Sequence, residues 1–155
     1  MSEAVRIFKN LAINAVNCLM ITLVMGALNV IRGGSFPPLA TNIVGYLFSF
    51  AVINLITTFI RGDLLGEALC RKVNAQPGST AFNLLINAVI NTVNTCFILP
   101  TMTWLNACFL GGAPTSAILP GVLQNFPYAW IATFIGPVLL GDKFGAWAEK
   151  FVNGK

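Results

Sequence analysis

Long stretches without a charged residue are the feature that most restricts how this 155-residue chain can fold. Twenty-two residues separate Lys9 from Arg32, and 28 separate Arg32 from Arg61. A third gap of 69 residues runs from Lys72 to Asp142. A transmembrane helix needs about 20 predominantly apolar residues. The gaps therefore predict membrane-spanning helices rather than a soluble domain, because soluble domains carry about 25% charged residues and this chain carries 9%.

The gaps predict four spans in one all-α integral membrane domain that covers residues 1–155. The longest gap holds two of them, because Gly-Gly-Ala-Pro at residues 111–114 is typical of a turn. The expected spans are residues 11–31, 39–60, 82–103 and 118–140. The first apolar run is longer than the core of a signal peptide and lacks a small-x-small cleavage site, so we expect it to be retained.

Basic residues predict the orientation of the spans. With four spans, both termini and the central loop share one side, where eight basic residues lie against Arg32 alone on the other. The eight are Arg6, Lys9, Arg61, Arg71, Lys72, Lys143, Lys150 and Lys155. The positive-inside rule then places both termini in the cytoplasm. Anionic lipid headgroups account for the net charge of +4, and no nucleic-acid partner is expected.

The two halves of the chain resemble each other. At a shift of 77 residues, 11 of the 28 positions between Ile13 and Ala40 are identical, and four asparagines align with asparagines. The match resumes at a shift of 79, where Gly62-Asp63 aligns with Gly141-Asp142. We therefore expect internal repeats at residues 10–75 and 87–154. Each repeat has two spans and a tail, so the two repeats should be parallel in the membrane.

The two tails, residues 62–73 and 141–152, are expected to form short amphipathic helices at the membrane interface. Asp63 and Asp142 are the expected N-caps, and Trp147 is an expected interfacial anchor. The alternative is that the tails form a docking surface for a protein partner.

Two stripes of asparagine are the strongest candidates for a functional site. They lie at helical spacing near the cytoplasmic ends of the first and third spans, at Asn10, Asn14, Asn17, Asn83, Asn87, Asn91 and Asn94. An unpaired amide in hydrocarbon costs several kcal/mol, about 2–7 by reference state, so these groups should face one another, another polar helix, or water. One interpretation is interhelical hydrogen bonding that joins the two spans. The other is a polar vestibule for a neutral or zwitterionic solute, or a path for an ion.

Other residues narrow the range of possible functions and sites. No Asp, Glu, Lys, Arg or His lies in a span core, so we expect neither an enzyme nor a proton-coupled carrier. The four cysteines show no paired spacing, so no metal and no cofactor is expected. Pro100 and Pro127 are candidate helix kinks. Asn125, two residues before Pro127, could instead contribute to a second polar spot.

Several motifs resemble those of one family. The sequence Cys-Phe-Ile-Leu-Pro-Thr-Met at residues 96–102, Asn-Phe-Pro at 125–127 and Gly-Pro at 136–137 are similar to a family of small bacterial membrane proteins. That family is catalogued only as domain of unknown function number 2798. Its two-span unit often occurs doubled. The resemblance implies a fold and a location in the bacterial cytoplasmic (inner) membrane, and it implies no activity.

These features predict a small-solute transporter or channel-like protein. Four helices alone rarely enclose a path, so we expect a homo-oligomer in the lipid bilayer. The alternative is a scaffold or accessory subunit that does not transport and that binds another membrane protein through its spans and tails.

Overall fold

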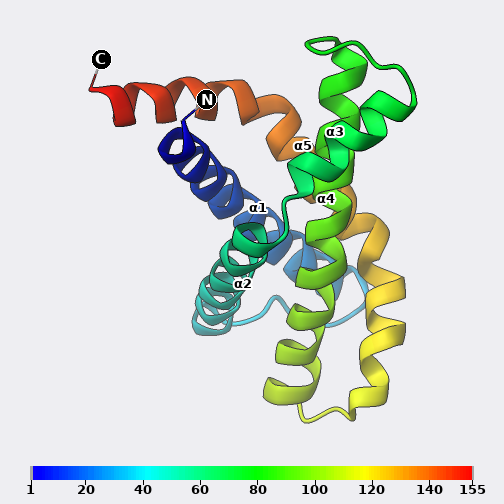
Figure 1. Cartoon of the computed structure of the whole chain (residues 1–155). Coiled ribbons are helices and arrows are strands. Elements are labelled where there is room, and N and C mark those ends of the chain that lie inside the picture. Colours follow the sequence, from blue (N-terminus) through cyan, green and yellow to red (C-terminus); the bar gives the residue numbers. More distant parts are fainter. Residues whose placement is uncertain (1, 155) are drawn as a thin grey trace.

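The computed structural model describes residues 2–154, which form five α-helices and two short helical segments without any strand (Figure 1). The elements are α1 (Glu3–Ile31), α2 (Leu39–Phe59), α3 (Gly62–Lys72), α4 (Thr80–Thr103), η1 (Trp104–Leu110), η2 (Thr115–Ala117) and α5 (Ile118–Asn153). The π-helical segment η1 extends α4 directly. Lys155 lies outside the described residues.

Three helical stretches are long and apolar enough to cross a membrane: Glu3–Ile31, Leu39–Phe59 and Thr80–Leu110. They correspond to three of the four predicted spans, which supports the prediction of an all-helical membrane protein. The fourth predicted span, residues 118–140, forms the first part of α5 and does not reach the same apolarity. Gln124 and Asn125, together with three prolines, lower the hydropathy of this stretch.

The prediction of a separate second tail helix was wrong. Helix α5 continues from Ile118 to Asn153 through Gly141 and Asp142, so Asp142 is an interior residue and not an N-cap. A glycine inside a helix costs only about 1 kcal/mol relative to alanine, which the surrounding helix can absorb. Figure 1 shows that the last part of α5 nevertheless runs at a steep angle to its first part.

The prediction for Asp63 also needs correction. Helix α3 begins at Gly62, and Arg61 occupies the N-cap position without a capping hydrogen bond from its side chain. Asp63 therefore lies in the first helical turn, where a carboxylate interacts favourably with the helix dipole. Serine takes the capping role elsewhere, because Ser2 Oγ accepts a hydrogen bond from the Val5 amide and Ser79 Oγ accepts one from the Phe82 amide.

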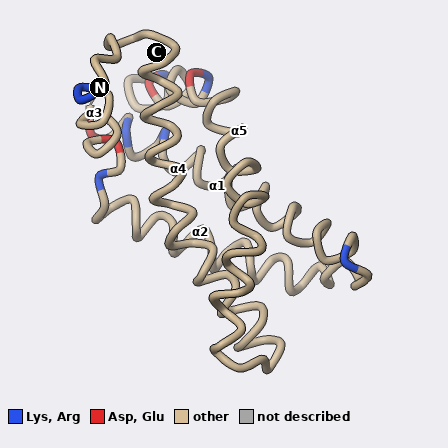
Figure 2. Tube along the Cα trace, turned by 90° about the vertical axis from the view of Figure 1, so that its right-hand side faces the viewer, with Lys and Arg blue, Asp and Glu red and all other residues tan. Residues whose placement is uncertain are grey.

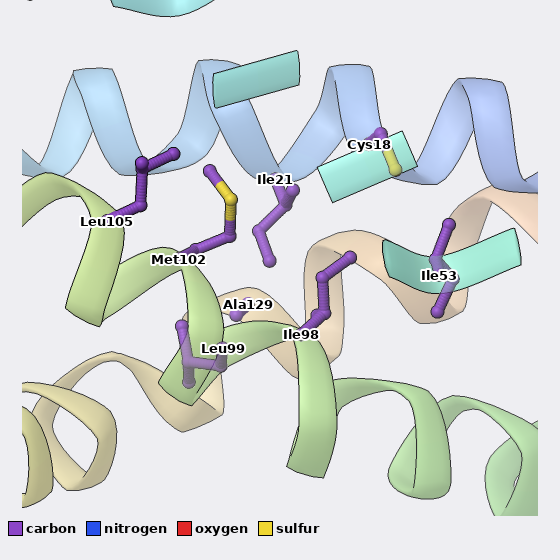
Figure 3. Packing of buried hydrophobic residues seen from close by; sticks show 8 residues of the cluster. All are labelled: Cys18, Ile21, Ile53, Ile98, Leu99, Met102, Leu105 and Ala129. Carbon is purple, nitrogen blue, oxygen red and sulfur yellow. The ribbon is translucent and has the colours of Figure 1, made fainter. Parts of the chain in front are cut away.

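A buried apolar cluster lies where the long helices meet. Figure 3 shows its side chains converging from α1, α2, α4, η1 and α5. The members are Cys18, Ile21, Ile53, Ile98, Leu99, Met102, Leu105 and Ala129. Helix α1 packs against α2 and α5, and α4 packs against α2, α3 and α5. The cluster therefore holds both halves of the chain together at mid-height.

Charged residues distinguish one end of the bundle from the other. Figure 2 shows charged positions gathered at the end that holds both termini and α3, with basic colour also well away from that end. Arg32 follows the last residue of α1, a helix of 29 residues that begins at the terminal end. A helix of this length spans about 43 Å, more than the hydrocarbon core.

Close packing of α3 on α4 depends on glycine. A Cβ atom added at Gly66 would lie 3.0 Å from the Cα atom of Ile86, and one at Gly62 would lie 3.4 Å from the Cα atom of Ile90. Gly66→Val should therefore push α3 away and lower the free energy of unfolding by about 1–3 kcal/mol, measured by thermal or denaturant unfolding in detergent. Gly141→Ala is the control, since nothing lies within 4 Å of its added Cβ. Equal stability of Gly66→Val and the unmodified protein would contradict the role of this contact.

Candidate functional site: two polar cavities

Two cavities lie at opposite ends of the bundle. One of about 480 Å³ is lined on α1 by residues between Arg6 and Asn17 and on α4 by residues between Thr80 and Asn94. We call it the Asn cavity. The other, of about 430 Å³, is lined by residues between Ile21 and Arg32 on α1 and by residues from Met102 to Leu110 on α4 and η1. We call it the Arg32 cavity. The same two helices therefore carry both cavities on successive halves of their length.

All seven predicted asparagines line the Asn cavity: Asn10, Asn14, Asn17, Asn83, Asn87, Asn91 and Asn94. Two of them join helices by hydrogen bonds. Asn14 Nδ2 donates to Asn54 Oδ1 at 3.0 Å on α2, and Asn91 Nδ2 donates to the Trp130 carbonyl at 2.8 Å on α5. Within residues 2–154, no hydrogen bond joins an asparagine of α1 directly to one of α4. The two stripes thus face a shared space and are not bonded to each other.

Asn17 has an unusual environment. It is only 8% exposed, and its Oδ1 atom is buried without a hydrogen-bond partner among the described residues. A Cβ atom added at Gly136 of α5 would lie 3.2 Å from that oxygen, so glycine lets the α5 backbone approach it. A buried acceptor without a partner costs about 1–3 kcal/mol. Such a group at the inner end of a polar cavity is a candidate ligand contact.

Charges of both signs surround the outer part of the Asn cavity. Arg6 and Lys9 supply positive charge, and Asp63, Glu67 and Asp142 supply negative charge. Two of the predicted interfacial residues, Asp63 and Asp142, therefore lie beside the asparagines. This mixture suits a neutral or zwitterionic molecule better than a strongly charged one.

Asp63 forms an ion pair with Arg61 at 2.7 Å. The hydrogen bond from Arg61 lowers the pKa of the Asp63 carboxyl below its usual value, and Asp63 raises the pKa of Arg61. Both side chains remain partly exposed, so water screens the pair.

The pair predicts a pH-dependent contribution to stability. The folded pKa of Asp63 is lowered, so its contribution is present above the unfolded value of about 3.9 and is lost as the pH falls through the folded pKa. Asp63→Asn should therefore reduce the Tm slightly at neutral pH, and the difference should vanish in strong acid. Arg61→Gln should have the same effect, and the double variant should add no further loss. Thermal unfolding across this pH range is the measurement, and a Tm difference that does not depend on pH would contradict it.

An apolar barrier separates the two cavities. Ile21 lies one helical turn beyond Asn17 on α1, and Ile98 lies one turn beyond Asn94 on α4, a rise of about 6 Å in each case. Ile21 and Ile98 are 1% and 4% exposed, and Leu99 beside them is fully buried. Buried apolar side chains therefore follow the cavity-lining asparagines within a single turn on both helices, together with the buried residues Thr22 and Thr95.

The Arg32 cavity was not identified from the sequence as a site. Among residues 2–154, Arg32 is the only charged residue that lines it, and its Nη1 group donates to Asn125 Oδ1 at 2.8 Å. Asn125 was predicted only as part of a second polar spot near Pro127, and Gln124 is exposed. A signal was present in the alignment of the halves, because Asn29 aligns with Asn106 and Met25 with Met102, and all four line this cavity.

The other predicted residues lie outside the cavities. Pro100 and Pro127 occur inside the continuous helices α4 and α5, and α4 changes to π-helical geometry four residues after Pro100. Trp147 is 49% exposed on α5 and stacks on Phe151 with ring centroids 5.6 Å apart. Among the described residues, no group of three or more His, Cys, Asp or Glu side chains could hold a metal ion.

Comparison with known proteins leaves the chain without an assigned family. No family model, no curated protein and no solved structure matches it. The resemblance to domain of unknown function 2798 therefore stays a prediction.

Proposed function

We propose that this chain is a four-span protein of the bacterial cytoplasmic membrane that moves a small neutral or zwitterionic solute, working as a homo-oligomer. The observation that carries the proposal is the pair of polar cavities on the same helices, separated only by the layer around Ile21 and Ile98. A hydrophobic constriction between two wet cavities is a common way to gate a pathway. The proposal includes no catalytic activity.

The surroundings of α5 support a fourth span. Residues 118–141 carry no charge, and α5 packs against both α1 and α4. The most polar buried residue of this stretch, Asn125, is 8% exposed and bonded to Arg32. A polar group that faces the interior of a bundle does not prevent a helix from crossing a bilayer.

Equivalent contacts support a duplicated hairpin. Helix α1 packs on α2 as α4 packs on α5. Gly66 contacts Ile86, and Gly145 contacts Lys9, which are matching pairs in the alignment of the halves.

The position of the charges supports cytoplasmic termini. Both termini lie at the end where charged residues gather (Figure 2), and Arg32 lies at the far end of α1. The positive-inside rule assigns the charge-rich end to the cytoplasm. Reporter fusions at either terminus test this orientation, and a periplasmic signal from one of them would contradict it.

Flux into proteoliposomes tests the transport proposal. Vesicles with and without the protein are exposed to gradients of glycine, acetamide or sodium chloride, and swelling is followed by light scattering. We expect faster entry of glycine or acetamide than in protein-free vesicles, with little change for the salt. Entry of both solutes at the protein-free rate would overturn the proposal.

A non-transporting scaffold is the alternative, and the aromatic pair Trp147 and Phe151 favours it. These two side chains are exposed, at 49% and 60%, on the C-terminal part of α5 beside charged residues. If they bind a partner, Trp147→Ala should release a stoichiometric membrane protein that copurifies with the unmodified chain. If Trp147 and Phe151 instead anchor the chain at the membrane interface, no such protein should copurify.

A further inference from the structure

The Arg32 cavity contains both unpaired positive charge and free acceptor oxygens. Within residues 2–154, the ion pairs do not include Arg32. Only its Nη1 group is engaged, by the Oδ1 atom of Asn125, which leaves the other guanidinium N–H groups and the Asn125 amide N–H groups as donors. A guanidinium held in this way is oriented for a carboxylate, which it binds through two parallel hydrogen bonds.

Three further asparagines line the cavity, and each donates one amide N–H to a backbone carbonyl. Asn29 donates to the Ser35 carbonyl at 2.6 Å, Asn42 to the Pro37 carbonyl at 2.9 Å, and Asn106 to the Met102 carbonyl at 3.0 Å. Their Oδ1 atoms are therefore held as acceptors. Acceptor oxygens without a nearby carboxylate suit an ammonium group better than a metal ion.

Apolar side chains make up much of the remaining lining, which also includes Thr22, Thr41 and Thr103, and the cavity is of suitable size. Met25, Met102 and Leu110 line it together with Ile21 of the barrier. Its volume of about 430 Å³ lies within the range of about 300–1,000 Å³ typical of small-molecule sites. Long flexible side chains such as methionine adapt to apolar ligands of different shape.

We propose that the Arg32 cavity binds a small zwitterion that carries a carboxylate, an ammonium group and an apolar side chain. The carboxylate binds Arg32 and the Asn125 amide, the ammonium group binds the asparagine oxygens, and the apolar part lies against the methionines. This inference deepens the proposed function by naming the chemical class of the solute, and it rests on that function only for the claim that the bound molecule is then moved.

Calorimetry on the full-length protein in phosphatidylcholine nanodiscs tests the assignment. L-leucine is compared with isopentylamine, which lacks the carboxylate, and with 4-methylpentanoate, which lacks the ammonium group. We expect L-leucine to bind at least about tenfold more tightly than either fragment, because each fragment leaves one set of polar groups unpaired. Absence of L-leucine binding, or equal binding of 4-methylpentanoate, would overturn the zwitterion assignment.

Two variants and a control test the role of Arg32. Arg32→Gln should weaken L-leucine binding by about tenfold or more, whereas Lys150→Gln removes one positive charge far from the cavity and should leave binding unchanged. Asn125→Asp is nearly isosteric and places a carboxylate beside Arg32, so it should weaken binding even if Arg32→Gln fails to fold. Unchanged affinity in Asn125→Asp would contradict the proposal.

A lipid phosphate could satisfy the same guanidinium, and a further measurement separates this source from a free solute. The titration is repeated in nanodiscs of phosphatidylcholine and phosphatidylglycerol in equal amounts. Retained L-leucine binding supports the free solute, whereas Arg32-dependent retention of phosphatidylglycerol without L-leucine binding would overturn it. Flux of glycine without any L-leucine binding would refute this inference alone. L-leucine binding without flux of glycine or acetamide would refute the proposed function alone.

Discussion

Replacement of Asn17 and Asn94 together by leucine is expected to reduce solute flux about tenfold or more while the protein stays folded. Both residues line the inner end of the Asn cavity, one turn before the apolar barrier. A solute that reaches this point loses water, and the amide groups replace part of the lost hydrogen bonding. Leucine has a similar size but offers no hydrogen bond, so the barrier to entry should rise.

Stability separates this effect from a structural one. The Oδ1 atom of Asn17 has no partner among the described residues, so its removal should leave the free energy of unfolding unchanged or raise it. Asn14→Leu with Asn91→Leu is the matched control, because these side chains hold interhelical hydrogen bonds. That pair should lose about 0.6–2 kcal/mol per site. Normal flux in folded Asn17→Leu/Asn94→Leu protein would rule out a pathway through the Asn cavity.

The second large effect is expected at the barrier. Ile21→Thr with Ile98→Thr should increase leakage of glycine through proteoliposomes by about tenfold or more, because a hydroxyl-lined constriction holds water more easily than an apolar one. Threonine keeps the β-branch, so the helices retain their rotamer preference. The measurement is the rate of vesicle swelling with no other driving force than the glycine gradient.

A surface substitution of the same type provides the control. Leu23 lies on α1 two residues beyond Ile21, and it is 48% exposed on the outside of the bundle. Leu23→Thr should leave leakage unchanged. If the barrier variant stays folded and leaks no faster than Leu23→Thr, the layer around Ile21 and Ile98 is not the gate.

Much of the local structure follows from the sequence. The charge-free gaps predicted four spans, and three of them lie on helices that are long and apolar enough to cross a membrane, because the length of an apolar run decides whether a helix can cross. The asparagine spacing of three and four residues indicated which side chains share a helix face. The structure brings all seven of these residues to one cavity.

The relation between helices was not predictable in the same way. Periodicity indicates a face on each helix but not which helix that face meets, so the bonds from Asn14 to α2 and from Asn91 to α5 appear only in the fold. Gly141 and Asp142 resembled a helix start locally, yet the continuous α5 includes both. The ionic and amide groups of the Arg32 cavity come from distant segments, and no local pattern joins Arg32 to Asn125.

The sequence by itself determined that the chain is helical, that its apolar stretches suit a membrane, and that its amides collect on two helix faces. Tertiary structure decided how those faces are paired, that the Oδ1 atom of Asn17 has no partner among the described residues, and that Arg32 lines a second cavity. The physical reason is that helix formation depends on neighbours within a few residues. Helix pairing depends on the shapes of side chains that meet from distant parts of the chain, such as Gly66 against Ile86.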